Sequence, residues 1–187
     1  GCGRSGTWLC VSCVSTIPPA FDNQENIRAR FDYHDTRIRS AIHKFKYKRG
    51  ERIGQILGLH LAEMIIEDLS DYALFNNSDR LIIVPAPLSS ERERERGFNQ
   101  AEVLSLVISE ITDLPLVTDA LTKIKNTPAQ VSLKDKRARL ANLRNAFVCI
   151  KPELVENRDI IVIDDVYTTG ATMREIPVEK RALQAQN

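Results

Sequence analysis

The chain has 187 residues, and its 26 Lys and Arg against 25 Asp and Glu give a formal net charge of +1. This balance gives no indication of a nucleic-acid partner or of another strongly charged partner. An apolar fraction of 43% is ordinary for a globular protein, and apolar runs of only a few residues exclude a transmembrane helix and membrane insertion.

Residues 1–20 are rich in cysteine and end near the dipeptide Pro18-Pro19, which indicates a small knob followed by a linker. We expect residues 21–187 to form the main domain. The first twenty residues lack the basic start and the long apolar core of a signal peptide, which favours the cytoplasm. In that reducing compartment, cysteines are more often thiols or metal ligands than disulfides.

Helical periodicity is clearest in the first half of the main domain. Apolar residues recur at helical spacing over 38–45, and more regularly over 53–65. A third helix is predicted to begin after Asn99, whose side chain can cap it, with Glu102 completing a capping-box pattern.

Continuous apolar runs over 81–84 and 160–163 predict strands that are buried on both faces. Shorter strands are expected at 115–120 and 146–150, with a polar, basic loop over 122–142 between them. Strands that alternate with helices predict a parallel α/β sheet with right-handed crossovers.

The stretch IIVIDDVYTTGAT, residues 160–172, places Asp164 and Asp165 directly after a predicted strand. Ligands of parallel sheets bind at this end of the strands. Neighbouring side chains on a strand point to opposite faces, so both carboxylates need water, a ligand or a hydrogen-bond donor. The small residues 168–172 can turn backbone N–H groups toward an anion at the start of a helix. One turn therefore offers acceptors for hydroxyls and a cradle for phosphate, which are the two features of a sugar phosphate.

This stretch resembles the signature with which type I phosphoribosyltransferases bind phosphoribosyl pyrophosphate (PRPP). Further segments resemble the ComF family, phosphoribosyltransferase-like proteins that are associated with DNA uptake and competence. These segments are VPAPLSSERERERGFNQAEVL (84–104), LTKIKNTPAQVSL (121–133) with RLANLRNAF (139–147), and IRSAIHKFKYKRGERIGQILG (38–58). The resemblance implies a type I phosphoribosyltransferase-like parallel sheet flanked by helices, with a small N-terminal zinc-ribbon-like knob.

The same resemblance assigns roles around PRPP and Mg²⁺. Asp164 and Asp165 would hold the ribose hydroxyls, and Asp165 is also the candidate base or a water-mediated contact of Mg²⁺. The residues that would bind the 5′-phosphate are Thr168, Thr169, Gly170, Ala171 and Thr172.

The pyrophosphate side of PRPP would be bound by residues of the Arg-Gly-Phe-Asn-Gln segment, namely Arg96, Gly97, Asn99 and Gln100. Arg96 is the main candidate because Gly97 lets the backbone approach a phosphate closely. Arg92 and Arg94 alternate with Glu, and we interpret them as a solvated surface.

Lys123 and Lys125 lie in the segment where related enzymes have a flexible loop that closes over the active site. By the resemblance, one of these two lysines is a catalytic residue that offers a cation to the leaving group.

Cys10 and Cys13 have the spacing of a zinc knuckle, and Cys2 precedes them. ComF proteins often carry two Cys-x-x-Cys pairs at this end. The resemblance therefore implies a structural Zn²⁺ in the intact protein with Cys2, Cys10 and Cys13 as ligands, the fourth ligand being absent from the chain. Cys149 lies in an apolar segment and is expected in the core.

Three functions stay open at this point. The first is phosphoribosyl transfer with release of pyrophosphate. The second is a non-catalytic PRPP- or nucleotide-sensing or DNA-handling module with competence-machinery partners. The third is a nucleotide-salvage phosphoribosyltransferase, and the sequence identifies no acceptor pocket that would decide among them.

The segment HKFKYKR, residues 43–49, alternates basic and aromatic residues, which can contact single-stranded DNA. The alternative interpretation places Phe45 in the core and the lysines in solvent. Near the C-terminus, Pro177 falls where the helix after the phosphate loop should continue. Family members continue with a full helix and a further strand, so we expect the domain to be C-terminally truncated.

Overall fold

The computed structural model describes residues 11–20, 27–47, 50–73, 78–124, 146–167 and 171–177, and the structural statements below concern these residues. The helices are α1 (Val11–Val14), α2 (Thr36–Tyr47), α3 (Glu51–Ala73), α4 (Ser90–Arg96), α5 (Gln100–Thr112) and α7 (Ala171–Glu175), with two 3-10 helices, η1 (Ser78–Arg80) and η3 (Pro152–Leu154). The strands are β1 (Leu81–Pro85), β2 (Leu121–Lys123), β3 (Phe147–Cys149) and β4 (Asp159–Ile163). The three predicted helices are confirmed as α2, α3 and α5.

The centre of the fold is a parallel pair of strands, β1 and β4, with Leu81 opposite Asp159 and Pro85 opposite Ile163. Every residue of β1 is buried. Leu81 and Ile83 belong to one apolar cluster and Ile82 and Val84 to another, as the two-residue period of a strand requires. The continuous apolar sequence of β1 therefore reflects a strand that is covered on both faces.

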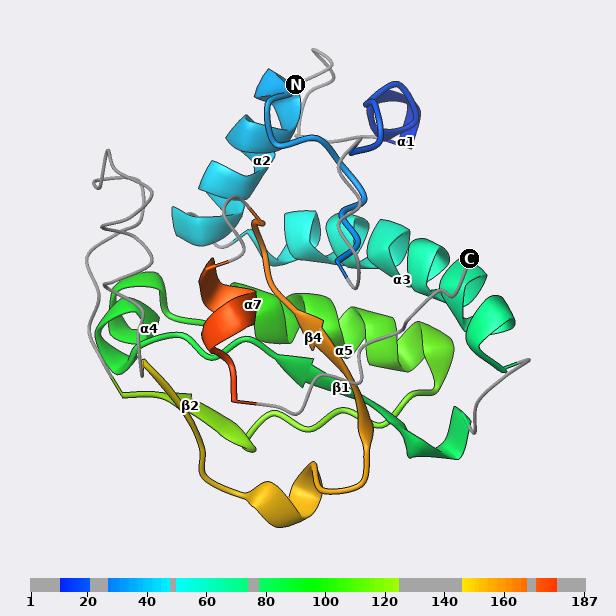
Figure 1. Cartoon of the computed structure of the whole chain (residues 1–187). Helices are drawn as coiled ribbons and strands as arrows, with labels where there is room; N and C mark the ends of the chain where they lie inside the picture. The colour runs from blue at the N-terminus through cyan, green and yellow to red at the C-terminus, as the bar shows by residue number, and fades with distance from the viewer. Residues whose placement is uncertain are drawn as a thin grey trace.

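Helices α3 and α5 lie side by side along one face of this pair (Figure 1). Two glycines of α3 allow the close approach. A Cβ atom at Gly54 would lie 2.8 Å from Cγ1 of Val103, and one at Gly58 would lie 2.8 Å from Cβ of Val107. Because real Cβ contacts are longer than this, larger residues at either position would push α5 away from α3.

The other face of β1 is covered by the antiparallel pair β2 and β3, in which Leu121 is opposite Cys149. The predicted strand at 146–150 is confirmed as β3, and the predicted parallel sheet flanked by helices is confirmed in the β1–β4 pair, while β2 and β3 form a separate antiparallel pair. The predicted strand at 115–120 is wrong in its extent. Leu116 makes a single parallel bridge to Ile83, and the chain then bends at residues 118–120 before β2 begins.

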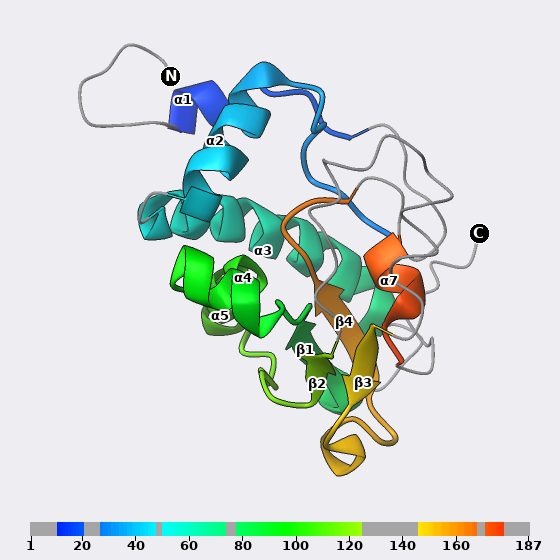
Figure 2. The same ribbon diagram turned by 90° about the vertical axis from the view of Figure 1, so that its left-hand side faces the viewer.

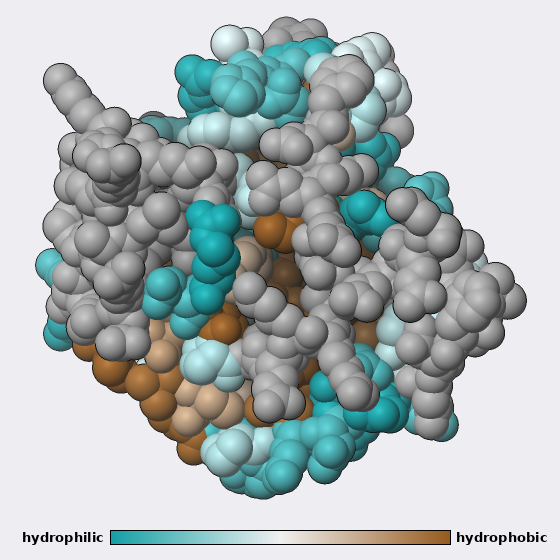
Figure 3. Space-filling model, in the orientation of Figure 1, coloured by the Kyte–Doolittle hydropathy of each residue, from teal (hydrophilic) through white to brown (hydrophobic). Residues whose placement is uncertain are grey.

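Exposed apolar residues directly follow both strands of the β2–β3 pair: Ile124 after β2 is 60% accessible and Ile150 after β3 is 53% accessible. The space-filling view shows apolar surface along its lower left edge, where Figure 1 places β2 (Figure 3).

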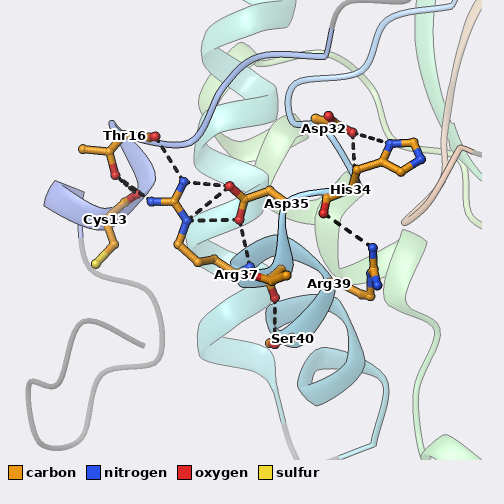
Figure 4. A network of polar contacts seen from close by, with 9 residues as sticks. Cys13, Thr16, Asp32, His34, Asp35, Arg37, Arg39 and Ser40 are labelled. Carbon is orange, nitrogen blue, oxygen red and sulfur yellow. Dashed lines mark hydrogen bonds and ion pairs between the residues drawn. The ribbon is translucent and has the colours of Figure 1, made fainter.

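The N-terminal segment packs on the helical side of the core, since Val14 and Ile17 belong to the same apolar cluster as α2 and α3. Arg37 joins this segment to the start of α2. Its guanidinium donates to both carboxylate oxygens of Asp35, and also to Oγ1 of Thr16 at 2.9 Å and to the Thr16 carbonyl (Figure 4). Asp35 in turn accepts from the Arg37 backbone N–H at 2.8 Å, which satisfies one of the unpaired donors of the first turn.

Candidate functional site

Asp164 and Asp165 follow the last residue of β4, next to the end of β1, where the Ala86 N–H donates to the Ile163 carbonyl at 2.8 Å. Their position at the carboxyl end of two parallel strands agrees with the sequence interpretation. The Asp165 backbone N–H donates to Oδ1 of Asp164 at 2.8 Å, so the two residues form one turn with two adjacent carboxylates.

Lys46, in the last turn of α2, forms an ion pair with Asp165. Its Nζ lies 2.8 Å from Oδ2 of Asp165, and the two side chains are only 20% and 12% exposed. The interpretation of the lysines in 43–49 as solvated is therefore wrong for Lys46, while Phe45 is fully buried, as that interpretation expected.

Asp164 differs from Asp165 in its environment. Burial raises the pKa of Asp164 from 3.8 to about 7, and the negative charge of Asp165 acts in the same direction. The Asp165 N–H and the cations Lys46 and Lys123 oppose this rise in the pKa. The pair therefore combines one lysine-bound carboxylate with one that takes up a proton near neutral pH.

Lys123, the last residue of β2, lies close enough to Asp164 for their charges to interact. Burial lowers the pKa of the Lys123 amine from 10.5 to about 8, and Arg92 and Arg96 lower it further, whereas Asp164 raises it. The amine also lies 5.4 Å from the ring centroid of Phe147, a cation–π distance. Lys123 is therefore placed among other cations, as a group that binds an anion would be.

Arg92 belongs to the same group of charges. Burial lowers the pKa of its guanidinium, and Arg96 acts in the same direction, while Tyr47, Glu95 and Asp165 oppose it. Arg92 is only partly exposed, so its interpretation as a solvated surface residue is wrong. For Arg94, which is exposed and donates to the Ser90 carbonyl of its own helix, that interpretation is confirmed.

Arg96, the last residue of α4, is held in place on two sides. Its Nη1 donates to Oε1 of Gln100 at 2.7 Å, and its guanidinium lies 5.6 Å from the ring centroid of Tyr47. Nε of Arg96 is buried and has no hydrogen-bond partner among the described residues. Such a group costs about 1–3 kcal/mol, which a bound acceptor would recover.

The neighbours of Arg96 shape its surroundings in three ways. Gly97 adopts a left-handed conformation with φ of 83°, which ends α4 and favours glycine. Asn99 caps α5 by accepting from the Ala101 N–H at 3.1 Å, as predicted. Gln100 is 1% exposed and donates from Nε2 to the Phe98 carbonyl, so its contact within the site is with Arg96.

The described cations of this site, Lys46, Arg92, Arg96 and Lys123, come from α2, α4 and β2 and lie around the carboxylates that follow β4. Figure 2 shows the segment after β4 extending toward α2 and α3. In the orientation of Figure 1, apolar atoms are visible in the middle of the face, with hydrophilic atoms to their left (Figure 3). Adjacent cations that repel one another favour an anionic ligand with several oxygens.

Comparison with known proteins shows related sequences along most of the chain. The DNA utilization protein YhgH of Escherichia coli strain K12 is 33% identical over 167 residues, which are 89% of this chain and 69% of that protein. The chain belongs to the ComF family.

Two other relatives of this ComF chain are matched over smaller shares of their length. Competence protein ComFC of Bacillus subtilis is 34% identical over 150 residues, 78% of this chain and 54% of that protein. Competence protein F of Haemophilus influenzae is 38% identical over 97 residues, 50% of this chain and 41% of that protein. No family model and no solved structure matches the chain.

Several predicted site residues of the ComF chain lie outside the described residues, namely Cys2, Cys10, Lys125, Thr168, Thr169 and Gly170. Ala171 and Thr172 open α7, which follows that segment. The helix ends at Glu175, two residues before Pro177. Cys13 and Cys149 form no disulfide among the described residues. Cys149 is only partly buried and packs against the second apolar cluster, so it lies at the margin of the core and not, as had been expected, inside it.

The described part of the ComF chain contains no group of three His, Cys, Asp or Glu residues that could hold a metal, and no helix long and apolar enough to cross a membrane. Sequence reasoning missed Lys46, Arg92 and Tyr47 as members of the site. The available signal was the alternation of basic and aromatic residues in 43–49, which was interpreted as a nucleic-acid contact or a solvated helix face.

Proposed function

We propose that this ComF chain binds PRPP and transfers its phosphoribosyl group with release of pyrophosphate, in a role connected with DNA uptake. The observation that carries the proposal is the charge interaction of Asp164 with Lys123 and of Asp165 with Arg92, together with the position of Arg96 near both of these cations. PRPP carries vicinal ribose hydroxyls, which can donate hydrogen bonds to carboxylates. Beside them it carries a pyrophosphate, whose negative charge cations can neutralise. The connection with DNA uptake rests on the names of the competence and DNA utilization relatives.

In this reaction the bond between C1 of the ribose and the pyrophosphate oxygen breaks, with an oxocarbenium-like sugar in the transition state. Negative charge increases on the departing oxygen. Arg96 and Arg92 would bind the pyrophosphate, and Lys123 would be protonated below a pH of about 8 and would add a positive charge. The unpartnered Nε of Arg96 supports a contact with a pyrophosphate oxygen.

Asp164 and Asp165 would accept hydrogen bonds from the ribose hydroxyls, and the segment 168–172 would hold the 5′-phosphate. The carboxylate that loses its proton near neutral pH, Asp164, suits proton transfer at the sugar or the acceptor, so it joins Asp165 as a candidate base.

The carboxylates of Asp164 and Asp165 have the oxygen ligands that Mg²⁺ prefers, but Lys46 already neutralises one of them. Mg²⁺ usually keeps several waters and is bound by one or two carboxylates together with substrate phosphates. We therefore propose that it enters with PRPP and supplies charge neutralisation at the pyrophosphate. A structural Zn²⁺ on Cys2, Cys10 and Cys13 is proposed separately, from the spacing of Cys10 and Cys13 and, for Cys2, from the resemblance to ComF proteins.

Calorimetry with PRPP and Mg²⁺ tests the binding step. We expect the wild-type chain to bind and the double variant Asp164→Asn/Asp165→Asn to lose about hundredfold or more in affinity, since two charged hydrogen bonds are removed. Asp119→Asn is the matched control, because Asp119 is an exposed carboxylate that pairs with Lys151. Absence of binding by the folded wild type would overturn the proposal.

A second candidate is a non-catalytic PRPP-binding module on the same fold that hands DNA to a partner. It is favoured by the names of the relatives, which refer to competence and DNA utilization rather than to a transferase. A pyrophosphate-release assay with PRPP and a panel of nucleobases and amines separates the two, and also tests a salvage role. Binding without release from any acceptor would favour the module.

A further inference from the structure

Lys46 reaches the carboxylate pair from α2, which lies outside the strands and loops of the sugar-phosphate signature. Its Nζ is 2.8 Å from Oδ2 of Asp165, and both side chains are largely shielded from solvent. A shielded pair is screened far less by salt than a surface pair, and loss of either partner leaves the other charge uncompensated.

The helix that carries Lys46 is firmly packed. Phe45, its neighbour in sequence, is fully buried and its ring centroid lies 5.8 Å from that of Phe98. At the other end of α2, Asp35 and Arg37 form hydrogen bonds that hold the first turn (Figure 4). Lys46 therefore extends from a fixed support toward the segment after β4.

The ion pair engages one of the two oxygens of Asp165. Among the described residues, Oδ1 of Asp165 has no hydrogen-bond partner, while Oδ2 is bound to Lys46. The backbone N–H of the same residue is bound to Asp164. The Oδ2 atom and the backbone N–H of Asp165 are therefore both engaged, which restricts the rotation of the side chain and leaves Oδ1 as the carboxylate oxygen outside the ion pair.

We propose that Lys46 is a positioning residue that holds Asp165 so that Oδ1 can accept a hydrogen bond from a ribose hydroxyl. The part that concerns ribose rests on the proposed binding of PRPP. Without the lysine, the two adjacent carboxylates would repel each other, and Asp165 would turn toward water.

The first experiment needs no ligand. Urea unfolding is measured for the wild type, Lys46→Met, Asp165→Asn and the double variant of the full chain. We expect strongly non-additive effects. Lys46→Met should change the unfolding equilibrium constant by a factor that is at least about threefold smaller in the Asp165→Asn background than in the wild-type background. Additive effects would overturn the proposal. If Lys46→Met does not fold, unfolding is measured instead for Lys46→Arg, which keeps the charge, and for the double variant, which removes both charges.

The second experiment is calorimetry of PRPP with Mg²⁺. We expect Lys46→Met to weaken binding by about tenfold to hundredfold, because a misplaced binding group loses most of its effect. Lys46→Arg keeps the charge and should restore affinity to within about threefold of the wild type. The matched control is Lys151→Met, which removes a lysine from an exposed ion pair.

The outcomes separate the two proposals. If Lys46→Met binds PRPP with the affinity of the wild type, the positioning role of Lys46 is overturned, while the proposed binding of PRPP stands. Absence of PRPP binding in the wild type, together with non-additive unfolding, would overturn the proposed function but support Lys46 as the residue that holds Asp165.

Discussion

Gln100 holds the guanidinium of Arg96 through a 2.7 Å hydrogen bond from Nη1 to Oε1, although Gln100 itself is 1% exposed. A buried amide at the start of α5 therefore orients a cation at the end of α4. The face of Tyr47 covers the same guanidinium. Within the part of the chain that the structure describes, Nε of Arg96 is left without an acceptor.

The first prediction concerns this pair. Gln100→Leu should weaken the binding of inorganic pyrophosphate by about three- to tenfold, because Arg96 loses the contact that fixes its orientation. Calorimetry measures the affinity, and Gln55→Leu on the exposed side of α3 is the matched control. Equal affinities in the wild type and Gln100→Leu would show that Gln100 does not orient Arg96 for binding.

The second prediction concerns the stability of the folded chain between pH 4 and 7. The pKa of Asp164 is raised to about 7 in the folded state from 3.8, so in this range the native state binds more protons than the unfolded state. The free energy of unfolding should therefore fall as pH rises, by an amount on the order of 1–3 kcal/mol for this group.

Urea unfolding at several pH values measures this effect. Asp164→Asn should remove that part of the decline, so the variant gains stability relative to the wild type as pH rises toward 7 and above. A pH profile of Asp164→Asn that runs parallel to that of the wild type would contradict the prediction.

The third prediction concerns Lys123. The pKa of its amine is lowered to about 8, so the amine loses its charge as pH rises through 8. Pyrophosphate affinity should fall by about tenfold between pH 7 and 9, since the charge of Lys123 is lost over this range. Lys123→Arg should bind with little dependence on pH, because arginine stays charged. The idea fails if both proteins show the same decline.

The fourth prediction concerns the packing of α3 on α5. Gly54→Ala should lower the free energy of unfolding by about 1–3 kcal/mol, since the new methyl group would lie 2.8 Å from Cγ1 of Val103 and 2.7 Å from Cε2 of Phe45. The better helix propensity of alanine returns at most about 1 kcal/mol. Urea unfolding measures the difference. Unchanged or increased stability would mean that Val103 and Phe45 move aside without strain.

Gly97→Ala provides a comparison with a different physical basis. No atom of the described residues lies within 4 Å of a Cβ at this position, so we expect its effect to arise from the left-handed backbone conformation, with φ of 83°. We expect a loss of about 1 kcal/mol, the usual penalty for a residue with a side chain in that conformation.

The sequence predicted those parts of the fold that have a local signal. Strands β1 and β4 follow from continuous apolar runs, and α5 follows from its period and its Asn99 cap. The strand predicted at 115–120 was misplaced because the chain pairs with β1 only around Leu116 and then bends. Propensity alone does not show where such a bend falls.

The carboxylates of the site were predicted because they follow a strand directly, whereas Lys46 and Arg92 were not. Lys46 is brought to Asp165 by the packing of α2, and the alternation of Arg92 with glutamates resembles a solvated helix face. Pairings between distant segments leave no periodic pattern in the sequence, so Lys46 and Arg92 became visible as site residues only in the fold.

The most direct test of the account is a crystal structure of the chain with PRPP and Mg²⁺. The account predicts the ribose hydroxyls on Asp164 and Asp165, and the pyrophosphate oxygens within hydrogen-bond distance of Arg96, including its Nε, and close to Lys123 and Arg92. PRPP bound elsewhere, or bound with its pyrophosphate away from these cations, would contradict it.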